Sequence, residues 1–390
     1  MNELKENNRI TKMFMLLCII SNSSYYPAIQ STRFGRNIVL VAWACVVITV
    51  PFFKKNILIF KNSCRTYLIL YFCFLGNSLL TTIFSEGNAF SNHFFRPVSV
   101  ASLIFFIAYH YGDEVGFTGL RSVCLAYMHI MNILSLPLYL IYLRGIDIYS
   151  MVYGYQNGKN EIAVLLFCTS VISIFLYKPT GFIWKMYRII FILVGILDVM
   201  TLKCRSVMAC YVMMFFFLIL FRGMITLKKK VLLVIISVGI LVFFFVNRDI
   251  WNIIQSYIIY AGREKGNIDS FSSGRITQIT MGLEVFQNNI LFGVGERVTL
   301  DCFYVSVLAN YGVGAWSIIL MAIFPIIYSM KRIVHRRVTE FDWCLLLIAV
   351  GMFVVSCLEE LAPFGPGTRC YILWLILGIM IKMEEVEYYE

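Results

Sequence analysis

The sequence predicts an all-α protein, a polytopic bundle of transmembrane helices with one long external helical loop. The first observation is composition: of 390 residues, 60% are hydrophobic and 14% are charged, and the mean hydropathy is +0.79. Soluble proteins carry about 25% charged residues. So few charges could not cover a soluble core of this size, so the surplus apolar surface requires lipid. The second observation is that apolar segments recur at the length that a bilayer requires.

Hydropathy along the chain predicts about 12 spans, with 11 as the alternative because several spans are short or merge through tight turns. The first nine spans occupy 1–247, the long loop occupies 248–301, and the last three spans occupy 302–390. The predicted spans are 13–29, 38–53, 66–83, 97–111, 122–142, 160–177, 187–202, 206–221, 231–247, 302–329, 342–359 and 369–383.

The first apolar segment and the cysteines exclude two other classes of protein. Residues 13–20 follow a charged start, but no small-residue cleavage site follows them, so we interpret this segment as a membrane anchor and not as a signal peptide. The 12 cysteines lie mostly singly within apolar segments, without CxxC or Cys/His spacing. We therefore predict neither a disulfide framework nor a metal site, and no cofactor.

The basic residues predict the orientation. With the N-terminus inside, 20 of the 33 Lys and Arg residues fall on the cytoplasmic side, including the clusters 228–230 and 331–337 that flank the long loop. Both termini are then cytoplasmic. The other 13 basic residues are many for an external face. We favour an anionic external ligand as the reason. The alternative is ordinary pairing with external acids such as Asp249, Glu264 and Glu296.

The loop 248–301 is long enough to be functional, and its pattern predicts two helices. Residues 250–260 (IWNIIQSYIIY) are typical of an interfacial helix with aromatic side chains. Residues 270–274 (SFSSG) offer N-cap chemistry for a second helix over 275–287. The apolar stripe of that helix is Ile276, Ile279 and Leu283, at i, i+3 and i+7.

Two external basic features could bind an anion. Lys203 and Arg205 lie between two apolar segments with almost no loop, where a charge must snorkel to the interface or find a partner. Arg205 begins the following helix, so we expect its side chain to point into the bundle. Arg275 opens the loop helix, where free backbone N–H groups and the helix dipole already favour an anion. The alternative for each is an ordinary interfacial or solvated charge.

A glycine-rich stretch and an acid precede the tenth span. Gly293 and Gly295 in FGVGER would let the backbone approach a ligand closely, although a simple turn is the commoner meaning. Asp301 at the mouth of the span is either a helix cap or a general base. Further polar residues near the membrane are Asn160, Glu161, Glu359 and Glu360, together with Asp198, which we expect to pair with Arg205 if one helix is continuous through both.

Taken together, these residues resemble the O-antigen ligase/polymerase superfamily, most closely the Wzy-type polymerases. The order of the motifs, the long external loop between two late spans and the number of spans all fit. The matching stretches are 157–161 (NGKNE), 203–206 (KCRS), 273–275 (SGR), 292–296 (FGVGE), 301–304 (DCFY) and 310–314 (NYGVG).

The resemblance implies a reaction at the external leaflet of the bacterial inner membrane. Such enzymes transfer a growing glycan (O-antigen, capsule or exopolysaccharide) from its undecaprenyl pyrophosphate carrier to a hydroxyl of another lipid-linked repeat unit, without a metal. Arg205 and Arg275 would bind the pyrophosphate and stabilise the leaving group. The expected substrate contacts are Lys203, Asn160, Glu161, Gly293, Gly295 and Tyr304. The implied partners are the lipid-linked oligosaccharide, the bilayer and a chain-length regulator, with no nucleic acid.

One departure separates this chain from the ligases of the superfamily, which place a histidine after the glycine-rich stretch. Here Asp301 occupies that region, which favours a polymerase and leaves Asp301, Glu296 and Glu161 as candidate bases. A lipid-linked oligosaccharide flippase is the main alternative, but it would show two similar halves and no long loop. A polyprenyl-phosphate-sugar glycosyltransferase needs an acid in its first external loop, and 22–37 contain none.

Overall fold

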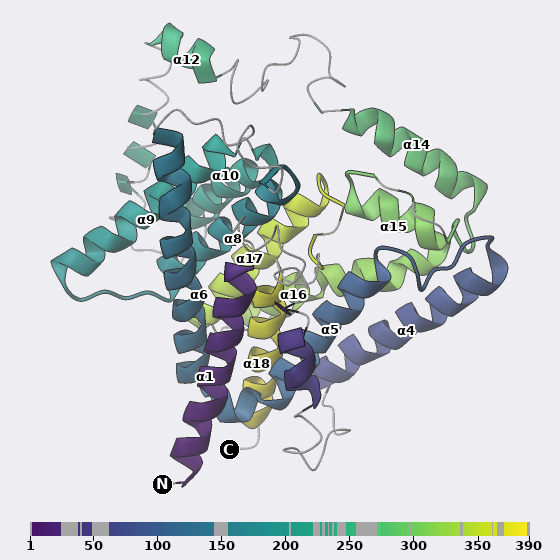
Figure 1. Ribbon diagram of the computed structural model, residues 1–390, viewed down its shortest axis with the longest axis horizontal. Helices are drawn as coiled ribbons and strands as arrows, with labels where there is room; N and C mark the ends of the chain where they lie inside the picture. Colours follow the sequence, from purple (N-terminus) through teal and green to yellow (C-terminus); the bar gives the residue numbers. More distant parts are fainter. Residues whose placement is uncertain are drawn as a thin grey trace.

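The structure is a computed structural model, in which every regular element among the described residues is a helix (Figure 1). The residues that it describes are 2–24, 38–39, 41–48, 62–143, 155–202, 204–220, 227, 231–232, 234–235, 238–239, 247–254, 272, 274–295, 298, 300–335, 338–360, 362–364 and 370–387.

The helices form two groups along the sequence, one before the long loop and one that includes the loop and the residues after it. The first group is α1 (Asn2–Ser23), α4 (Asn62–Phe84), α5 (Phe95–His110), α6 (Gly112–Leu143), α8 (Tyr155–Phe175), α9 (Phe182–Thr201) and α10 (Arg205–Leu220). The second group is α12 (Arg248–Ile254), α14 (Arg275–Asn288), α15 (Phe303–Tyr311), a 3₁₀ turn (Gly312–Ala315), α16 (Trp316–Val334), α17 (Glu340–Ser356) and α18 (Tyr371–Glu387).

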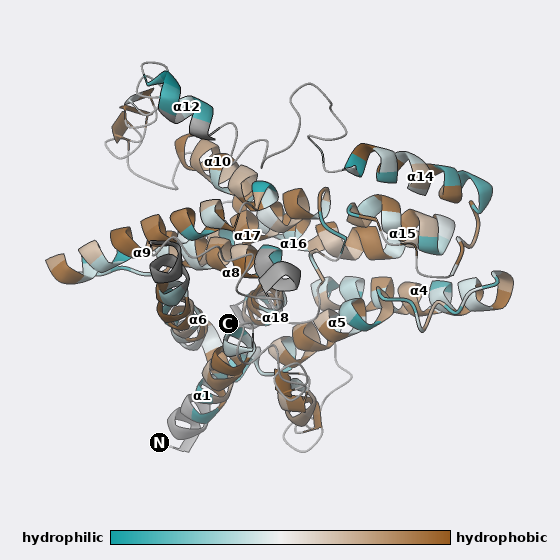
Figure 2. Cartoon of the chain, turned by 45° about the horizontal axis from the view of Figure 1, so that its top comes forward, coloured by the Kyte–Doolittle hydropathy of each residue, from teal (hydrophilic) through white to brown (hydrophobic). Residues whose placement is uncertain are grey.

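The described helices confirm the predicted class of helical membrane protein. Three of them are long and apolar enough to cross a bilayer, Asn62–Phe84, Gly112–Pro137 and the nearly continuous Phe303–Val334. Shorter apolar helices accompany them at Phe95–His110, Asn160–Phe175 and Arg205–Leu220. Many large apolar side chains are also exposed, and Figure 2 shows hydrophobic residues along much of the length of the helices. Such a surface suits a hydrocarbon solvent and not water.

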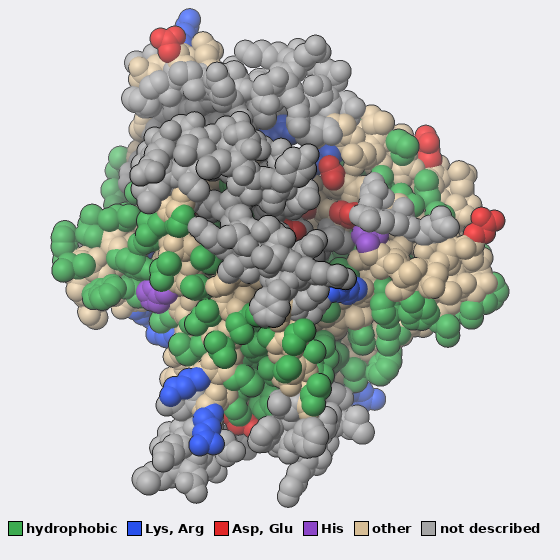
Figure 3. Space-filling model, in the orientation of Figure 1, with side chains coloured by type: hydrophobic (Ala, Val, Ile, Leu, Met, Phe, Trp, Pro, Cys, Tyr) green, Lys and Arg blue, Asp and Glu red, His purple; other side chains and the backbone are tan. Residues whose placement is uncertain are grey.

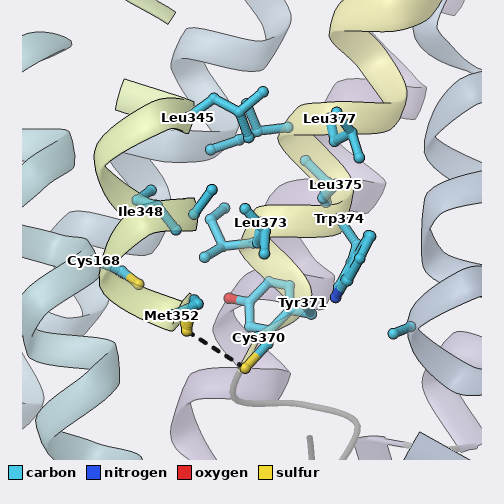
Figure 4. Close-up of a cluster of buried hydrophobic side chains, with 14 of the residues drawn as sticks. Cys168, Leu345, Ile348, Met352, Cys370, Tyr371, Leu373, Trp374, Leu375 and Leu377 are labelled. Atoms are coloured by element: carbon cyan, nitrogen blue, oxygen red, sulfur yellow. Dashed lines mark hydrogen bonds between the residues drawn. The ribbon is translucent and has the colours of Figure 1, made fainter. Parts of the chain in front are cut away.

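The core lies where α17 and α18 meet. Helix α18 is buried on every face because it packs against α5, α6 and α17, and its apolar sequence leaves no polar stripe for solvent. Figure 4 shows Leu345, Ile348 and Met352 of α17 facing the side chains of α18. The Cys370 thiol reaches the Met352 sulfur at 3.7 Å at the lower end of this cluster. This packed pair of helices gives the bundle a rigid centre.

Helix α17 connects two polar clusters at opposite ends of the bundle. Its first residue, Glu340, binds Arg121 (2.8 Å) and Lys178. Just beyond its last residue, Glu359 binds Asn160 and Arg275. A helix of this length rises about 25 Å. The same division is visible in Figure 1, where α12 and α14 lie at the upper edge while α1 begins and α18 ends at the lower edge.

A buried ionic network closes the end of the bundle near Glu340. Arg332 of α16 donates from Nε to Asp342 Oδ1 at 2.6 Å, and both side chains are buried. Asp342 also forms a capping box with Thr339, which explains why α17 begins there. Glu384 of α18 approaches the same arginine at 3.5 Å. Three helices are therefore held together by one guanidinium.

The long loop and the tenth span differ from the expected pattern in detail. The loop helix predicted at 275–287 is confirmed as α14, whereas only the first part of 250–260 lies in α12 and the rest is outside the described residues. The span predicted at 302–329 is divided at Gly312, whose φ is +56°. A Cβ there would lie 2.5 Å from the Ile290 carbonyl oxygen, so glycine is required for the close approach of the loop.

Candidate functional site

Arg275 is presented by the first turn of α14. The helix begins after Gly274, whose φ of +76° favours glycine, and Ser272 Oγ accepts the N–H of Ile276 at 3.4 Å. The N-cap residue is Gly274, which has no side chain to cap the helix, so the serine-rich stretch contributes through Ser272 from before the N-cap position; Ser273 lies outside the described residues. The expected apolar stripe of α14 is not its packing face, since Ile276 and Leu283 are exposed while Gly282 packs on Leu300.

The guanidinium of Arg275 lies between two carboxylates. Its Nη2 donates to Glu359 Oε1 at 3.3 Å, and its Nε lies 3.5 Å from Asp301 Oδ2. Only 17% of the arginine side chain is exposed, against 49% for Asp301 and 14% for Glu359. Nε is buried and makes no hydrogen bond with any described residue. The arginine is therefore oriented by Glu359, and one donor beside the half-exposed Asp301 stays unused.

Two further contacts hold these acids in place. Asn160, near the start of α8, donates from Nδ2 to the same Glu359 oxygen at 2.8 Å. Gln278, one turn after Arg275 in α14, accepts the backbone N–H of Asp301 at 2.8 Å. Side chains from α8, α14, the start of α15 and the end of α17 thus meet at one place. We call Arg275, Asp301, Glu359 and Asn160 the arginine cluster.

A histidine that the sequence analysis did not consider lies beside this cluster. His93, in the turn between α4 and α5, places Nε2 at 2.6 Å from Glu360 Oε1. Its ring packs on Phe94 with 4.1 Å between ring centroids. On the face drawn in Figure 3, acidic, basic and histidine side chains gather near α14 and α15. The only signal in the sequence was the Glu359–Glu360 doublet, because nothing linked it to a turn more than 200 residues earlier.

The glycines of the FGVGER stretch approach protein backbone closely. Gly293 has φ +67°, and a Cβ there would lie 2.4 Å from the Asn310 carbonyl carbon. Gly295 has φ +68° and would clash with Ser85. The N–H of Gly295 donates to the Asn310 carbonyl at 3.1 Å. In this structure the glycines therefore let the loop pack on α15 and the α4–α5 turn.

Asn310 connects the parts of the site. Its buried side chain accepts from Asn92 Nδ2 at 2.7 Å and from the N–H of Val298 at 3.3 Å, and it donates to the Ser306 carbonyl at 2.6 Å. The turn that carries His93 and the segment that leads to Asp301 are thereby fixed to the same helix. The sequence motif included Asn310, but its role follows only from these contacts.

The remaining predicted residues are placed as follows. Glu161 is buried beside Asn160, and Tyr304 is half-buried in α15 with its ring 5.4 Å from that of Phe353 in α17. Arg205 is the first residue of α10, which packs against α17 through a contact of the Cys210 thiol with the Gly351 carbonyl at 3.3 Å. Lys203 and Glu296 lie outside the described residues.

The expected pair of Asp198 with Arg205 is wrong. Helix α9 ends at Thr201 and α10 begins anew at Arg205, so the two residues do not share a helical face. Neither carboxylate oxygen of Asp198 accepts a hydrogen bond from a described residue. The pairing was predicted on the condition of one continuous helix, and that condition fails because α9 ends at Thr201.

Within the described parts of the chain, no group of three His, Cys, Asp or Glu side chains is placed to hold a metal ion. No protein-family model and no curated protein sequence matches this chain.

Proposed function

We propose that this protein is a glycan polymerase, which joins repeat units carried on undecaprenyl pyrophosphate. The observation that carries the proposal is the arginine cluster. A guanidinium that is largely shielded from water, with one donor unused, stands next to a half-exposed carboxylate at one end of an apolar bundle. An arginine fork suits phosphate oxygens, and its charge is worth more where water is excluded.

In the proposed reaction, an acceptor hydroxyl attacks C1 of the sugar that is attached to the donor pyrophosphate. The C1–O bond to phosphate breaks, and its electron pair leaves with the undecaprenyl pyrophosphate. The hydroxyl proton passes to a base on the protein. Arg275 stabilises the charge that develops on the leaving phosphate. In the structure without donor, Glu359 and Asp301 hold the arginine in position. Binding of the donor would exchange the longer, more exposed contact with Asp301 for a phosphate oxygen.

Other predicted residues complete the proposed site. Arg205 is the first residue of α10, a helix that packs along α17. The Asn160 amide donates a hydrogen bond to Glu359. We assign Arg205 and Lys203 as further cations for the pyrophosphate. Asn160, Glu161 and Tyr304 belong to the substrate region, which lies between the starts of α8 and α15. Gly293 and Gly295 shape the loop, and Glu296 remains a candidate catalytic acid.

The topology belongs to the same proposal. We propose about 12 spans in the bacterial inner membrane, with both termini in the cytoplasm and 248–301 outside. The two polar clusters at the ends of α17 support this orientation. With the N-terminus inside, the predicted spans put Arg121, Lys178 and Arg332 on the cytoplasmic side, and their contacts lie at one end of α17. The same spans put Asn160 and Arg275 outside, and these two residues meet at the other end.

Deletion of the gene in its host, followed by analysis of the glycan, tests the proposal. Loss of a polymerase should leave single lipid-linked repeat units in the outer leaflet, where a membrane-impermeant glycosidase reaches them. Loss of a flippase would keep those units inside and protected. Loss of a ligase would leave long polymer on its lipid carrier. An unchanged ladder of chain lengths after deletion would refute the polymerase assignment.

A further inference from the structure

We propose that His93, which lies beside Glu360, is the base that takes the proton of the acceptor hydroxyl. This inference rests on the proposed function and names a catalytic residue for it. The reaction needs a proton acceptor near the arginine cluster. A carboxylate already engaged with Arg275 has fewer free lone pairs for that purpose. Both Glu359 and Asp301 contact this arginine.

The imidazole lies against a carboxylate that can stabilise its charge. His93 Nε2 is 2.6 Å from Glu360 Oε1, so the imidazolium formed when the ring takes a proton is stabilised there. The two atoms do not make a hydrogen bond, and Nδ1 has no hydrogen-bond partner among the described residues either. One nitrogen of a neutral imidazole carries a lone pair, which can accept the proton. Both nitrogens are covered by protein and the side chain is 13% exposed, so the acceptor reaches that lone pair when the ring rotates about its broad χ2 torsion.

The turn that bears His93 is held at a defined position. Asn92, the preceding residue, donates to the buried Asn310 at 2.7 Å, and its own Oδ1 accepts the N–H of Phe94 at 3.1 Å. The imidazole packs on the Phe94 ring, which in turn packs on Phe303 of α15. These contacts fix the backbone that carries His93. A base on a supported turn needs little ordering when substrate binds.

The position relative to Arg275 also fits one substrate. Glu360, which contacts His93, directly follows Glu359, which contacts Arg275. The Cα atoms of neighbouring residues are about 3.8 Å apart. The imidazole, which would meet the acceptor hydroxyl, and the guanidinium, which would meet the donor phosphate, thus lie beside consecutive carboxylates. The proton moves from the hydroxyl to a ring nitrogen of His93, while the electron pair of the C1–O bond leaves with the pyrophosphate.

The charged groups around His93 are known from the contacts of each element. Glu360 faces the imidazole directly, and Glu359, Arg275 and Asp301 form the adjoining arginine cluster. A variant that lacks only the imidazole separates the role of His93 from the roles of these groups.

The experiment uses the purified full-length protein in lipid nanodiscs with a lipid-linked repeat unit, and measures the initial rate of polymer formation against pH. For His93→Ala we expect a loss of about 10²- to 10⁴-fold and partial recovery with added imidazole. Affinity for the lipid-linked unit should be unchanged. Glu360→Gln should lower the rate, because it removes the negative charge that stabilises the imidazolium as the proton is transferred. His335→Ala changes an exposed histidine at the other end of the bundle and should have no effect.

Each outcome decides between assignments. A normal rate in both His93→Ala and the isosteric His93→Gln would overturn the proposal. So would a loss that imidazole does not rescue in a protein with unchanged thermal unfolding. If Asp301→Asn lost activity while both His93 variants kept it, the base would be Asp301. If the wild-type protein formed no polymer, the polymerase assignment itself would fail, and this inference with it.

Discussion

Replacement of Arg275 by lysine tests whether the guanidinium fork binds the donor. Lysine keeps the positive charge but offers one ammonium in place of two separated donors. In the structure, Nη2 is engaged by Glu359 at 3.3 Å and Nε faces Asp301 at 3.5 Å without a hydrogen bond. A single lysine ammonium cannot keep the contact with Glu359 and also donate to a phosphate oxygen from the place that Nε occupies.

The expected magnitude follows from the burial of this side chain. With 17% of Arg275 exposed, its hydrogen bonds are largely shielded from water. Loss of one charged hydrogen bond in such a site costs about 1.5–3 kcal/mol, or roughly 10- to 150-fold in rate. Arg→Lys at Arg205 should behave in the same way if that residue also binds the pyrophosphate. We expect short glycan chains in cells that carry either variant.

The assay is the chain length of the glycan in a deletion strain that expresses each variant at equal protein level. Arg248→Lys is the matched control, because Arg248 is an exposed arginine at the start of α12 in the same predicted external loop. It should give wild-type chains. Full-length polymer from both Arg275→Lys and Arg205→Lys would refute the phosphate-binding role, because an ammonium would then serve as well as the fork.

Three further predictions concern topology and stability. A cysteine at Ser270 should react with a membrane-impermeant maleimide in whole cells and one at Val338 only after lysis, and the reverse pattern would invert the assigned topology. Asp342→Ala should lower the free energy of unfolding by about 3–5 kcal/mol, because it removes the short, fully buried partner of Arg332 and leaves only the longer contact with Glu384, whereas Glu340→Gln in a half-exposed pair should cost about 0–1 kcal/mol. Equal losses in thermal unfolding would contradict this difference. Gly293→Ala should cost more than about 1 kcal/mol, because its φ is +67° and its Cβ would meet backbone at 2.4 Å; unchanged thermal unfolding would show that the loop can adjust.

Much of the fold follows from local properties of the chain. Apolar content and segment length predict a helical membrane protein because lipid accepts apolar side chains and requires backbone groups to be bonded within each helix. The start of α14 was predictable for a similar reason. Serine and glycine before a periodic apolar segment are local signals, and the helix begins at Arg275 as expected. The predicted bounds of the long loop, 248–301, also placed Arg275 and Asp301 in the same part of the chain.

Contacts between residues far apart in the sequence could not be predicted from these local patterns. The sequence analysis named Glu359 and Asn160 only as polar residues near the membrane. In the structure the Asn160 amide donates to a carboxylate oxygen of Glu359, although 199 residues separate the two. The sequence contains no histidine near Asp301, and the fold supplies one from a distant turn through His93 and Glu360. The glycines of the loop could equally have approached a ligand, and the structure shows them against Asn310 and Ser85.

The sequence by itself determined that this protein requires lipid, that it is helical and that a helix begins at Arg275, because each depends on residue type and spacing within about one span. Only the tertiary structure decided which polar residues share a site. Side chains such as those of Arg275, Glu359 and His93 are brought together by the packing of α8, α14 and α15 around the end of α17. That packing depends on the fit of apolar surfaces far from the site, which no local pattern around these residues records.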